Sequence, residues 1–338
     1  MKIKVNGDYY INFNDFSLSS SLDSVASSFS FTSFFDIENA DHKKFFRPLS
    51  FHKVEFFNDA NQLFFTGTIV SHKFNSTENP EMVTLSGYSL PGVLEDCTIP
   101  YSSYPLESLG SSLKEIASRV LQPFGIGYKI FTEVARECSL PYTKSVAEPS
   151  ESVKEYLSKL ASQRNIIISH DRHGRLVFFK PNKNAKPIRS YTEENTSNIS
   201  LDVDGQGLHS KLTILRQPSK DGSNLTPEDT ISNPMIKVFR PTVEVLSSGE
   251  ETDTKSGVEN FMADELKNIK VKIELDRWDG MMTGDIIEVH NHEVFLFNTS
   301  RFMVMSTTIN EGTEGRTMSI DAVLPEAFSG GEPKNIFL

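Results

Sequence analysis

The spacing of the apolar residues constrains the fold most strongly, because it changes twice along the chain. Alternating apolar and polar positions, separated by turn residues, fill the first hundred residues and return after about residue 198. A period of two is typical of β-strands with one buried face. The first hundred residues are therefore predicted to form an antiparallel barrel or sandwich. Its predicted strands are 2–5, 13–18, 28–33, 50–57, 62–71 and 82–88.

Between residues 105 and 182 the apolar residues recur at steps of three and four, the spacing of amphipathic helices. One helix is predicted over 106–121, and a second over 150–161, with Ser150 placed to cap its start. Residues 166–180 then predict a hairpin in which Gly174 supplies a positive φ. This stretch is predicted to be a small α+β domain.

The rest of the chain predicts a second β unit made of two separated pieces. Its predicted strands are 198–203, 209–215, 271–275, 285–290, 295–310 and 316–323. Residues 217–233 and 247–257 are polar and predicted to be exposed loops, and a helix is predicted over 258–268 after Ser256.

The predicted fold class is mainly β with α+β inserts: two antiparallel β-barrel domains and small α+β domains. The predicted domains are a first barrel (1–104), an α+β domain (105–184), a second barrel (185–216 with 270–325), an inserted loop and helix region (217–269) and a C-terminal tail (326–338).

Charge and composition narrow the classes of function. The net charge is −11, which argues against a protein that grips phosphate backbones through a basic face. No run approaches the roughly 18 apolar residues of a membrane helix, and the first ten residues show no signal-peptide pattern. The sequence therefore predicts a soluble globular protein, neither secreted nor inserted in a membrane.

Cys97 and Cys138 are the only cysteines, too few for a disulfide framework or a multi-cysteine metal site. Both are predicted to be ordinary buried thiols. The 25 Phe residues allow two interpretations, a stacking platform for single-stranded nucleic acid or a protein core with subunit contacts. Few basic residues interleave with them, which favours the core and the contacts.

Two histidine pairs are spaced closely enough in the sequence to be candidate metal ligands. His170 and His173 flank a predicted turn, and His290 and His292 share one face of a predicted strand. Neither pair has an identifiable third ligand in the sequence, so solvated turn and strand polarity is the favoured interpretation and metal binding the alternative.

Adjacent carboxylates offer no acid–base pair, because neighbouring side chains in strands and loops point apart. These pairs are Glu95–Asp96, Glu193–Glu194 and Glu250–Glu251. The sequence also has no Gly-x-Ser-x-Gly elbow and no glycine-rich phosphate loop. No catalytic residue, cofactor site or metal site is predicted, and no enzymatic activity.

Several segments together resemble the baseplate hub proteins of contractile phage tails, of the Mu-like and P2-like kind, which are related in fold to the hub of T4-like tails. These segments are 4–7, 13–18, 21–31, 84–97, 151–180, 278–289, 302–309 and 319–328. The chain has Thr283 where the family usually has Pro before the Gly-Asp of the closing barrel, and residues 217–257 match nothing in the family.

The resemblance implies a structural role. Such hubs are homotrimers in which two tube-type barrels per chain build a pseudo-six-fold ring. The ring joins the hexameric tail tube, or its initiator, to a trimeric central spike, beside baseplate wedge or sheath-adjacent proteins. DNA passes through the channel without specific binding, as an acidic lumen would allow. The expected location is the virion tail, after assembly in the host cytoplasm.

Two functions of other classes stay open. A hub-associated cell-wall hydrolase predicts two carboxylates facing one cleft. A carbohydrate-binding tail-tip adhesin predicts exposed clusters of Trp and Tyr, although the chain has one Trp, Trp278. A prophage-derived particle or a bacterial injection device would use the same hub.

Overall fold

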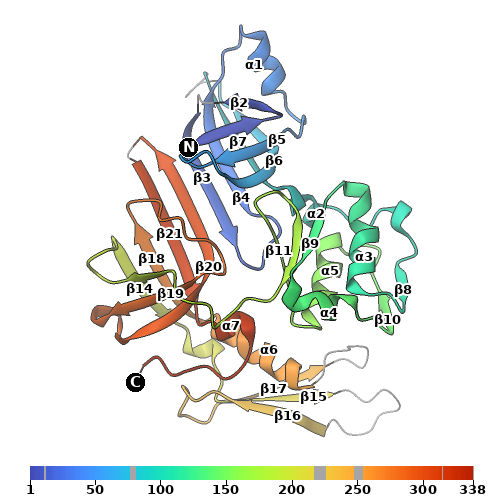
Figure 1. Ribbon diagram of the computed structural model, residues 1–338, viewed down its shortest axis with the longest axis vertical. Helices are drawn as coiled ribbons and strands as arrows, with labels where there is room; N and C mark the ends of the chain where they lie inside the picture. Colours follow the sequence, from blue (N-terminus) through green and yellow to red (C-terminus); the bar gives the residue numbers. More distant parts are fainter. Residues whose placement is uncertain (11–12, 77–80, 217–225, 247–253, 314, 338) are drawn as a thin grey trace. The chain divides into compact units, whose positions relative to one another are not determined.

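The computed structural model describes all residues except 11–12, 77–80, 217–225, 247–253, 314 and 338 (Figure 1). The chain forms two compact units. The first contains Met1–Ser158, Ile168–Phe178 and Thr308–Met318, and the second contains Lys159–Ile167, Phe179–Thr307 and Ser319–Leu338. This division is coarser than the predicted domains, whose boundaries stay predictions.

The first unit begins with an antiparallel sheet whose strands follow the order β3-β4-β7-β6-β5-β1-β2. Its strands are β1 (Lys2–Val5), β2 (Asp8–Tyr10), β3 (Phe13–Ser21), β4 (Ser28–Phe34), β5 (Lys53–Phe57), β6 (Leu63–Phe74) and β7 (Met82–Ser89). All six strands predicted in this part are present, although the one predicted from residue 50 begins at Lys53. The helix α1 (Ala40–Phe45) between β4 and β5 was not predicted, because it is only six residues long.

Aromatic side chains fill the core of this sheet. Strand β4 alternates strictly, so that Phe29, Phe31 and Ser33 are buried between more exposed neighbours. The ring centroids of Phe16 on β3 and Phe56 on β5 lie 5.0 Å apart, although these strands are not neighbours in the sheet. The sheet therefore curls around one aromatic cluster.

Two glycines allow this close packing. A Cβ atom at Gly67 would lie 2.4 Å from the Tyr88 carbonyl oxygen, and one at Gly87 would lie 1.9 Å from the Thr68 carbonyl oxygen. Neither position has room for a side chain, so both require glycine.

Residues 308–318, the tip of a long hairpin, also belong to the first unit. Strand β20 (Leu296–Gly312) lies next to β3, and Ser19 Oγ is 3.1 Å from Thr308 Oγ1. Arg316 binds Asp59 through both Nη atoms and donates from Nε to Glu311 at 2.9 Å. The hydrogen bond from Arg316, with one from the Met1 ammonium, holds the pKa of the Asp59 carboxyl well below its usual range.

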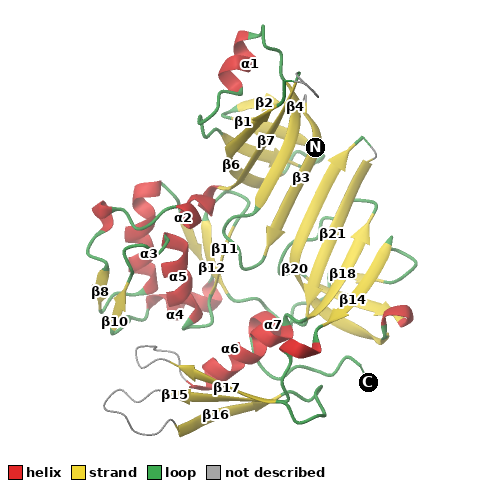
Figure 2. Cartoon of the chain, turned by 180° about the vertical axis from the view of Figure 1, so that it is seen from behind, coloured by secondary structure: helices red, strands yellow, loops and turns green. Residues whose placement is uncertain are grey.

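The α+β part of the first unit follows β7 (Figure 2). Its elements are η1 (Leu90–Gly92), α2 (Val93–Asp96), η2 (Tyr101–Ser103), β8 (Glu107–Leu109), α3 (Leu113–Leu121), η3 (Gln122–Phe124), β9 (Tyr128–Ile130), η4 (Thr132–Val134), α4 (Ala135–Ser139), β10 (Lys144–Val146), α5 (Val153–Ser162), β11 (Ile167–His170) and β12 (Leu176–Phe179). The predicted hairpin is confirmed, with Gly174 at φ 75°.

Both helix starts predicted in this part need correction. Helix α3 begins at Leu113, where Ser112 and Glu115 form a capping box, and Leu109 lies instead on β8, paired with Lys144. Helix α5 begins at Val153, and its cap is Ser152, whose Oγ accepts from the Glu155 amide at 3.1 Å. Ser150 is therefore not the cap. In both cases the reciprocal Ser and Glu contacts fix a later start than the apolar spacing alone indicates.

The second unit contains strands of the large sheet and a small three-stranded sheet with a helix packed against it. Its elements are β13 (Arg189–Tyr191), β14 (Asn198–Val203), η5 (Gly205–Gly207), β15 (Lys211–Arg216), β16 (Thr226–Ser232), β17 (Pro241–Leu246), α6 (Thr254–Leu266), β18 (Ile269–Leu275), β19 (Ile286–Asn291), η6 (His292–Val294), β21 (Gly315–Val323), shared with the first unit like β20, and α7 (Glu326–Ser329). Strand β13 pairs in parallel with β19, whereas β14–β18 and β19–β20 pair antiparallel.

Helix α6 packs against the three-stranded sheet β16-β15-β17. The loop predicted over 217–233 is wrong for 226–232, which forms β16, and its earlier part lies outside the described residues. Strand β17 was not predicted. The loop predicted over 247–257 is wrong from Thr254 onward, where α6 starts, and its residues 247–253 are not described. Strand β15 is the sheet partner of the polar strand β16, and helix α6 packs against it, so β16 is stabilised by segments distant in the sequence.

The predicted fold class is confirmed: the chain is mainly β, with a large antiparallel sheet and small sheets. No helix in the described ranges has the length and apolar character to cross a membrane.

Candidate functional site

The first histidine pair lies at the β11–β12 turn, and its members have separate roles. The Nε2 atom of His170 is 2.6 Å from Ser27 Oγ, and its ring packs edge-on against Phe65. Burial lowers the pKa of His170, which favours the neutral ring. The His173 amide instead donates to Asp171. The pair is part of a hydrogen-bonded turn.

Asp171 organises this turn. Its carboxylate accepts from the amides of His173 and Arg175 and from Arg175 Nε at 2.7 Å. Burial by itself would raise the pKa of Asp171, but the hydrogen bonds from Arg175 lower it on balance. The turn is therefore explained by local structure.

His290 and His292 lie where β19 ends and η6 begins. Their ring centroids are 4.7 Å apart with the planes nearly perpendicular, and His290 Nε2 is 3.2 Å from the Phe297 carbonyl oxygen. Across the part of the chain that the structure describes, no three His, Cys, Asp or Glu side chains are grouped to hold a metal ion. That neither histidine pair binds a metal stays a prediction.

The adjacent carboxylates bind different partners. Asp96 accepts from the Tyr88 hydroxyl at 2.6 Å, while Glu95 lies 3.7 Å from Lys154 Nζ. Burial first, and then Asp96, raise the pKa of Tyr88. Glu193 and Glu194 are exposed, and Glu250–Glu251 lies outside the described residues.

The two cysteines form no disulfide and belong to different elements. Cys138 is buried on α4, as predicted. Cys97 is half-buried, so the prediction of a buried thiol is wrong for this residue. Cys97 ends α2, where its carbonyl accepts from the Val153 amide at the start of α5.

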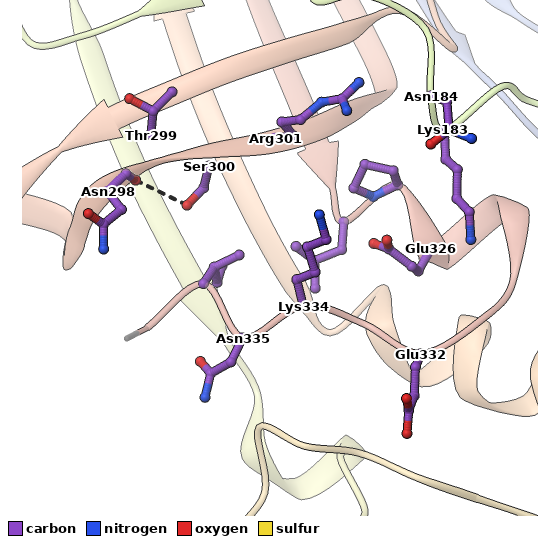
Figure 3. A pocket seen from close by; sticks show the side chains of 13 residues that line it. Lys183, Asn184, Asn298, Thr299, Ser300, Arg301, Glu326, Glu332, Lys334 and Asn335 are labelled. Atoms are coloured by element: carbon purple, nitrogen blue, oxygen red, sulfur yellow. Dashed lines mark hydrogen bonds between the residues drawn. The ribbon is translucent and has the colours of Figure 1, made fainter.

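A pocket of about 450 Å³ lies in the second unit, between the start of β20 and the C-terminal segment (Figure 3). Its lining is Lys183, Asn184, Asn298, Thr299, Ser300, Arg301, Leu324, Pro325, Glu326, Glu332, Lys334, Asn335 and Ile336. Lys183 Nζ donates to the Gly330 carbonyl at 3.0 Å, and Arg301 Nη2 donates to the Ala185 carbonyl at 2.5 Å. Both cations thus hold backbone segments in place.

The hydroxyl side chains of the pocket are Thr299 and Ser300, and the Ser300 hydroxyl donates to the Asn298 carbonyl at 3.1 Å. Neither His nor Cys is among the residues that line it. Three cations face two carboxylates, so its charge selects no single class of ligand.

The segment 39–53 of the first unit presents a second candidate surface, of the kind that binds proteins. Leu49 and Phe51 are 77% and 57% exposed, and both have positive φ, 61° and 47°. Lys43, Lys44 and Arg47 are exposed on the same segment. Exposed apolar side chains rimmed by polar residues are found at protein interfaces, and this segment carries both kinds of residue.

Comparison with known proteins bears on the α+β part first. Residues 91–180 match the family described as "Baseplate hub protein gp44-like, second domain". This part of the chain is therefore similar to the second domain of baseplate hub proteins. The resemblance to baseplate hubs predicted from the sequence is confirmed.

Solved structures share the fold across nearly the whole chain. The 43 kDa tail protein of prophage MuSo2 from Shewanella oneidensis has a TM-score of 0.80 at 19% identity, covering 96% of this chain and 98% of that one. A tail protein from Neisseria meningitidis MC58 has a TM-score of 0.76 at 18% identity, covering 97% of each chain.

A more distant likeness extends to a secretion system. The E. coli c3393 protein, described as a type VI secretion component similar in structure to the T4 tail proteins gp27 and gp5, has a TM-score of 0.60 at 12% identity. It covers 99% of this chain and 80% of its own. The TM-scores of these three structures show a shared fold. No curated protein matches the sequence.

The hub domain carries an exposed tyrosine pair on η2. Tyr101 is 86% exposed, and its ring centroid lies 5.2 Å from that of Tyr104. Paired exposed rings of this kind can stack on a sugar or pack in a protein interface. The spacing of Tyr101 and Tyr104 along the chain does not predict that their rings lie together and exposed.

Proposed function

We propose that the chain is a non-enzymatic structural hub of a contractile phage tail baseplate, working as a homotrimer. Three chains with two tube-type barrels each would form a pseudo-six-fold ring that joins the hexameric tail tube to a trimeric spike. The observation that carries the proposal is the fold likeness to phage tail proteins over almost the full length of both chains, together with the hub-family match of residues 91–180.

The charge of the chain suits a channel for DNA. Three copies would carry three times −11, or −33, and a negative lumen would repel the DNA backbone enough to let it slide. Tail tube, spike and wedge proteins would be the partners, and the virion tail the location.

Native mass and particle images test the proposal. Three copies of 38.0 kDa give 114 kDa, so native mass spectrometry of the purified chain should show a species of that mass, and electron microscopy a ring with six-fold-like lobes. A chain that stays monomeric both alone and when co-expressed with its tube and spike proteins would contradict the trimeric hub.

A carbohydrate-binding adhesin is the second candidate, and the Tyr101–Tyr104 pair is the observation that favours it. An adhesin should bind cell-surface saccharides on a glycan array and lose that binding in Tyr101→Ala. Tyr9→Ala is the matched control, because Tyr9 is also exposed, whereas replacing a buried tyrosine such as Tyr142 would disturb the core. Absence of saccharide binding by the unmodified chain would remove this candidate.

A further inference from the structure

Leu49 and Phe51 are held in an unfavourable conformation and yet bury little of their surface. Both lie in the left-handed region, which is costly for side chains with a bulky Cβ substituent. Both also stay largely in water, at 77% and 57% exposure. Neither the backbone conformation nor the side-chain position is therefore explained by the stability of this unit.

The loop is fixed at both ends, so its exposed residues have a defined position. On one side, Phe46 is buried at 1% exposure, and its ring packs edge-on against Phe35 at 5.9 Å. On the other side, the His52 carbonyl accepts from the Ile69 amide at 3.0 Å, and the Lys53 carbonyl accepts from the Asn6 amide at 2.8 Å. Leu49 and Phe51 are thus presented by a braced loop.

The charge around these residues is opposite to that of the chain. Segment 39–53 contains four Lys or Arg and one Asp, a net charge of +3. Since the whole chain has a net charge of −11, the residues outside the segment have a net charge of −14. Lys53 is paired with Glu55 at 2.7 Å. Lys43, Lys44 and Arg47 are exposed and meet no carboxylate among the residues that the structure describes.

From these observations we infer that segment 39–53 docks on another protein, through an apolar depression rimmed by Asp and Glu side chains that receives Leu49 and Phe51. The braced apolar pair supplies anchors of the kind that dominate interface energetics, and the three cations supply orientation and association rate. The inference rests on the proposed function, because it takes the chain to work inside a multiprotein particle.

Charge disfavours two-fold self-association through this segment, because an isologous contact would place Lys43, Lys44 and Arg47 of two copies against one another. A neighbouring copy in the proposed trimer would make a heterologous contact instead, and the crosslinking experiment below distinguishes that copy from a different protein. The described pocket of the second unit carries three cations of its own and does not complement the segment.

A lipid surface is a poorer fit than a protein. Helices that lie in membrane interfaces use a long amphipathic face, whereas α1 spans six residues with none of them buried. A fluid surface also has no need for a pair of apolar side chains held in one costly geometry, while a shaped depression does.

Site-specific photocrosslinking in the assembled particle tests the inference. The full chain carrying benzoylphenylalanine at position 51 is supplied to cells that produce the particle, and the purified particles are irradiated and digested for mass spectrometry. The expected product joins position 51 to a peptide of a different protein that contains Asp or Glu beside apolar residues. The same crosslinker at Phe239, which is 86% exposed in the second unit, is the matched control and should not give that product.

Other outcomes overturn the inference. A product with a second copy of this chain, a product with lipid, or no product at position 51 while the chain is present in the particles would each refute it and leave the hub proposal standing. Absence of the chain from the particles would refute both proposals.

Two variants separate docking from folding. Leu49→Asn with Phe51→Asn should leave the thermal midpoint of the full chain unchanged or raise it, because Asn tolerates the left-handed region better. The same double variant, with the crosslinker moved to Ser50, should reduce the yield of the product at least tenfold relative to the crosslinker at Ser50 alone. Charge reversal of Lys43, Lys44 and Arg47 to Glu should cause a similar loss, and an unchanged yield in both variants would overturn the assignment of these residues.

Discussion

The two large β regions of the molecule are built from cores of different chemistry. In the first unit, the rings of Phe16, Phe29 and Phe65 lie 5.0–5.4 Å from Phe56. In the second unit, buried side chains of the strands are mostly aliphatic: Ile199, Val271, Ile273, Ile286, Ile287, Val289, Val304 and Ile320.

The difference shows how each core makes room for itself. The aromatic core needs Gly67 and Gly87, where rings and neighbouring carbonyls occupy the space of a Cβ atom. The described strand residues of the second unit contain no glycine. Branched aliphatic side chains with stiff χ1 angles fill a pleated surface without such openings. Similar sheets therefore tolerate different substitutions.

The largest effect is expected from removing the ring at the centre of the aromatic core. Phe56→Ala should cost about 3–5 kcal/mol, because a fully buried ring leaves a cavity and loses its edge-on partners. Ile273→Val in the second unit, which removes one buried methylene, should cost about 0.5–1.5 kcal/mol. Urea unfolding followed by hydrogen exchange of peptides from each unit measures both. Equal costs would mean that core chemistry does not distinguish the units.

A smaller but sharper effect is expected at Gly87. Gly87→Ala should destabilise the first unit by about 3 kcal/mol, the upper end of typical overpacking costs, because the new Cβ would meet the Thr68 carbonyl at 1.9 Å. Gly127→Ala is the control, since its nearest neighbour is Arg175 Cγ at 3.5 Å. Chemical denaturation of the two variants should differ clearly, and a tolerated Ala at position 87 would disprove the need for glycine in the aromatic core.

Acid should weaken the aromatic region through His170. Burial lowers the pKa of His170 in the folded chain, so below the ordinary value of about 6.5 the unfolded chain binds the proton first. The stability that His170 contributes is complete above about pH 6.5 and is lost as the pH falls toward the lowered pKa. The slope from this one residue is at most about 1.4 kcal/mol per pH unit.

Denaturation midpoints between pH 7.5 and 5 measure this slope. His170→Gln should flatten the profile of the first unit, while His173→Gln, an exposed neighbour on the same turn, should not. A profile unchanged by His170→Gln would show that other groups control the acid response.

The smallest effect is expected at the ion pairs of the hairpin tip. Arg316 bridges Asp59 and Glu311, and the Asp59 side chain is 62% exposed. Arg316→Gln should cost at most about 1 kcal/mol, and the difference should shrink in high salt because exposed charges are screened. Thermal midpoints at low and high salt measure it, and a large, salt-independent loss would mean that the tip is held as a buried pair.

Much of the fold was predictable because alternation is a local property. Strands β4 and β14 coincide with their predicted ranges to within a residue, since each has one buried face. Strands β16 and β17 and helix α1 were missed, because their residues are mostly polar or their length is short. Their stability comes from partners distant in the sequence. That the chain has no catalytic residue stays a prediction.

The candidate surfaces were less predictable than the fold. The basic residues of segment 39–53 are visible in the sequence, but the exposure of Leu49 and Phe51 is not, since Phe51 falls in a strand predicted from residue 50 and Leu49 directly precedes that strand. The pocket combines residues from 183 to 336, and no local pattern joins them.

The sequence by itself determined the alternating strands, the helical middle part, the absence of a disulfide framework and the likeness to baseplate hubs, because these depend on residue spacing and composition. Only the tertiary structure decided where α3 and α5 start, that β13 and β19 run parallel, and that Leu49 and Phe51 face solvent from a braced loop. Each of these depends on which distant segments satisfy a backbone group or cover a side chain, and spacing along the chain carries no record of that choice.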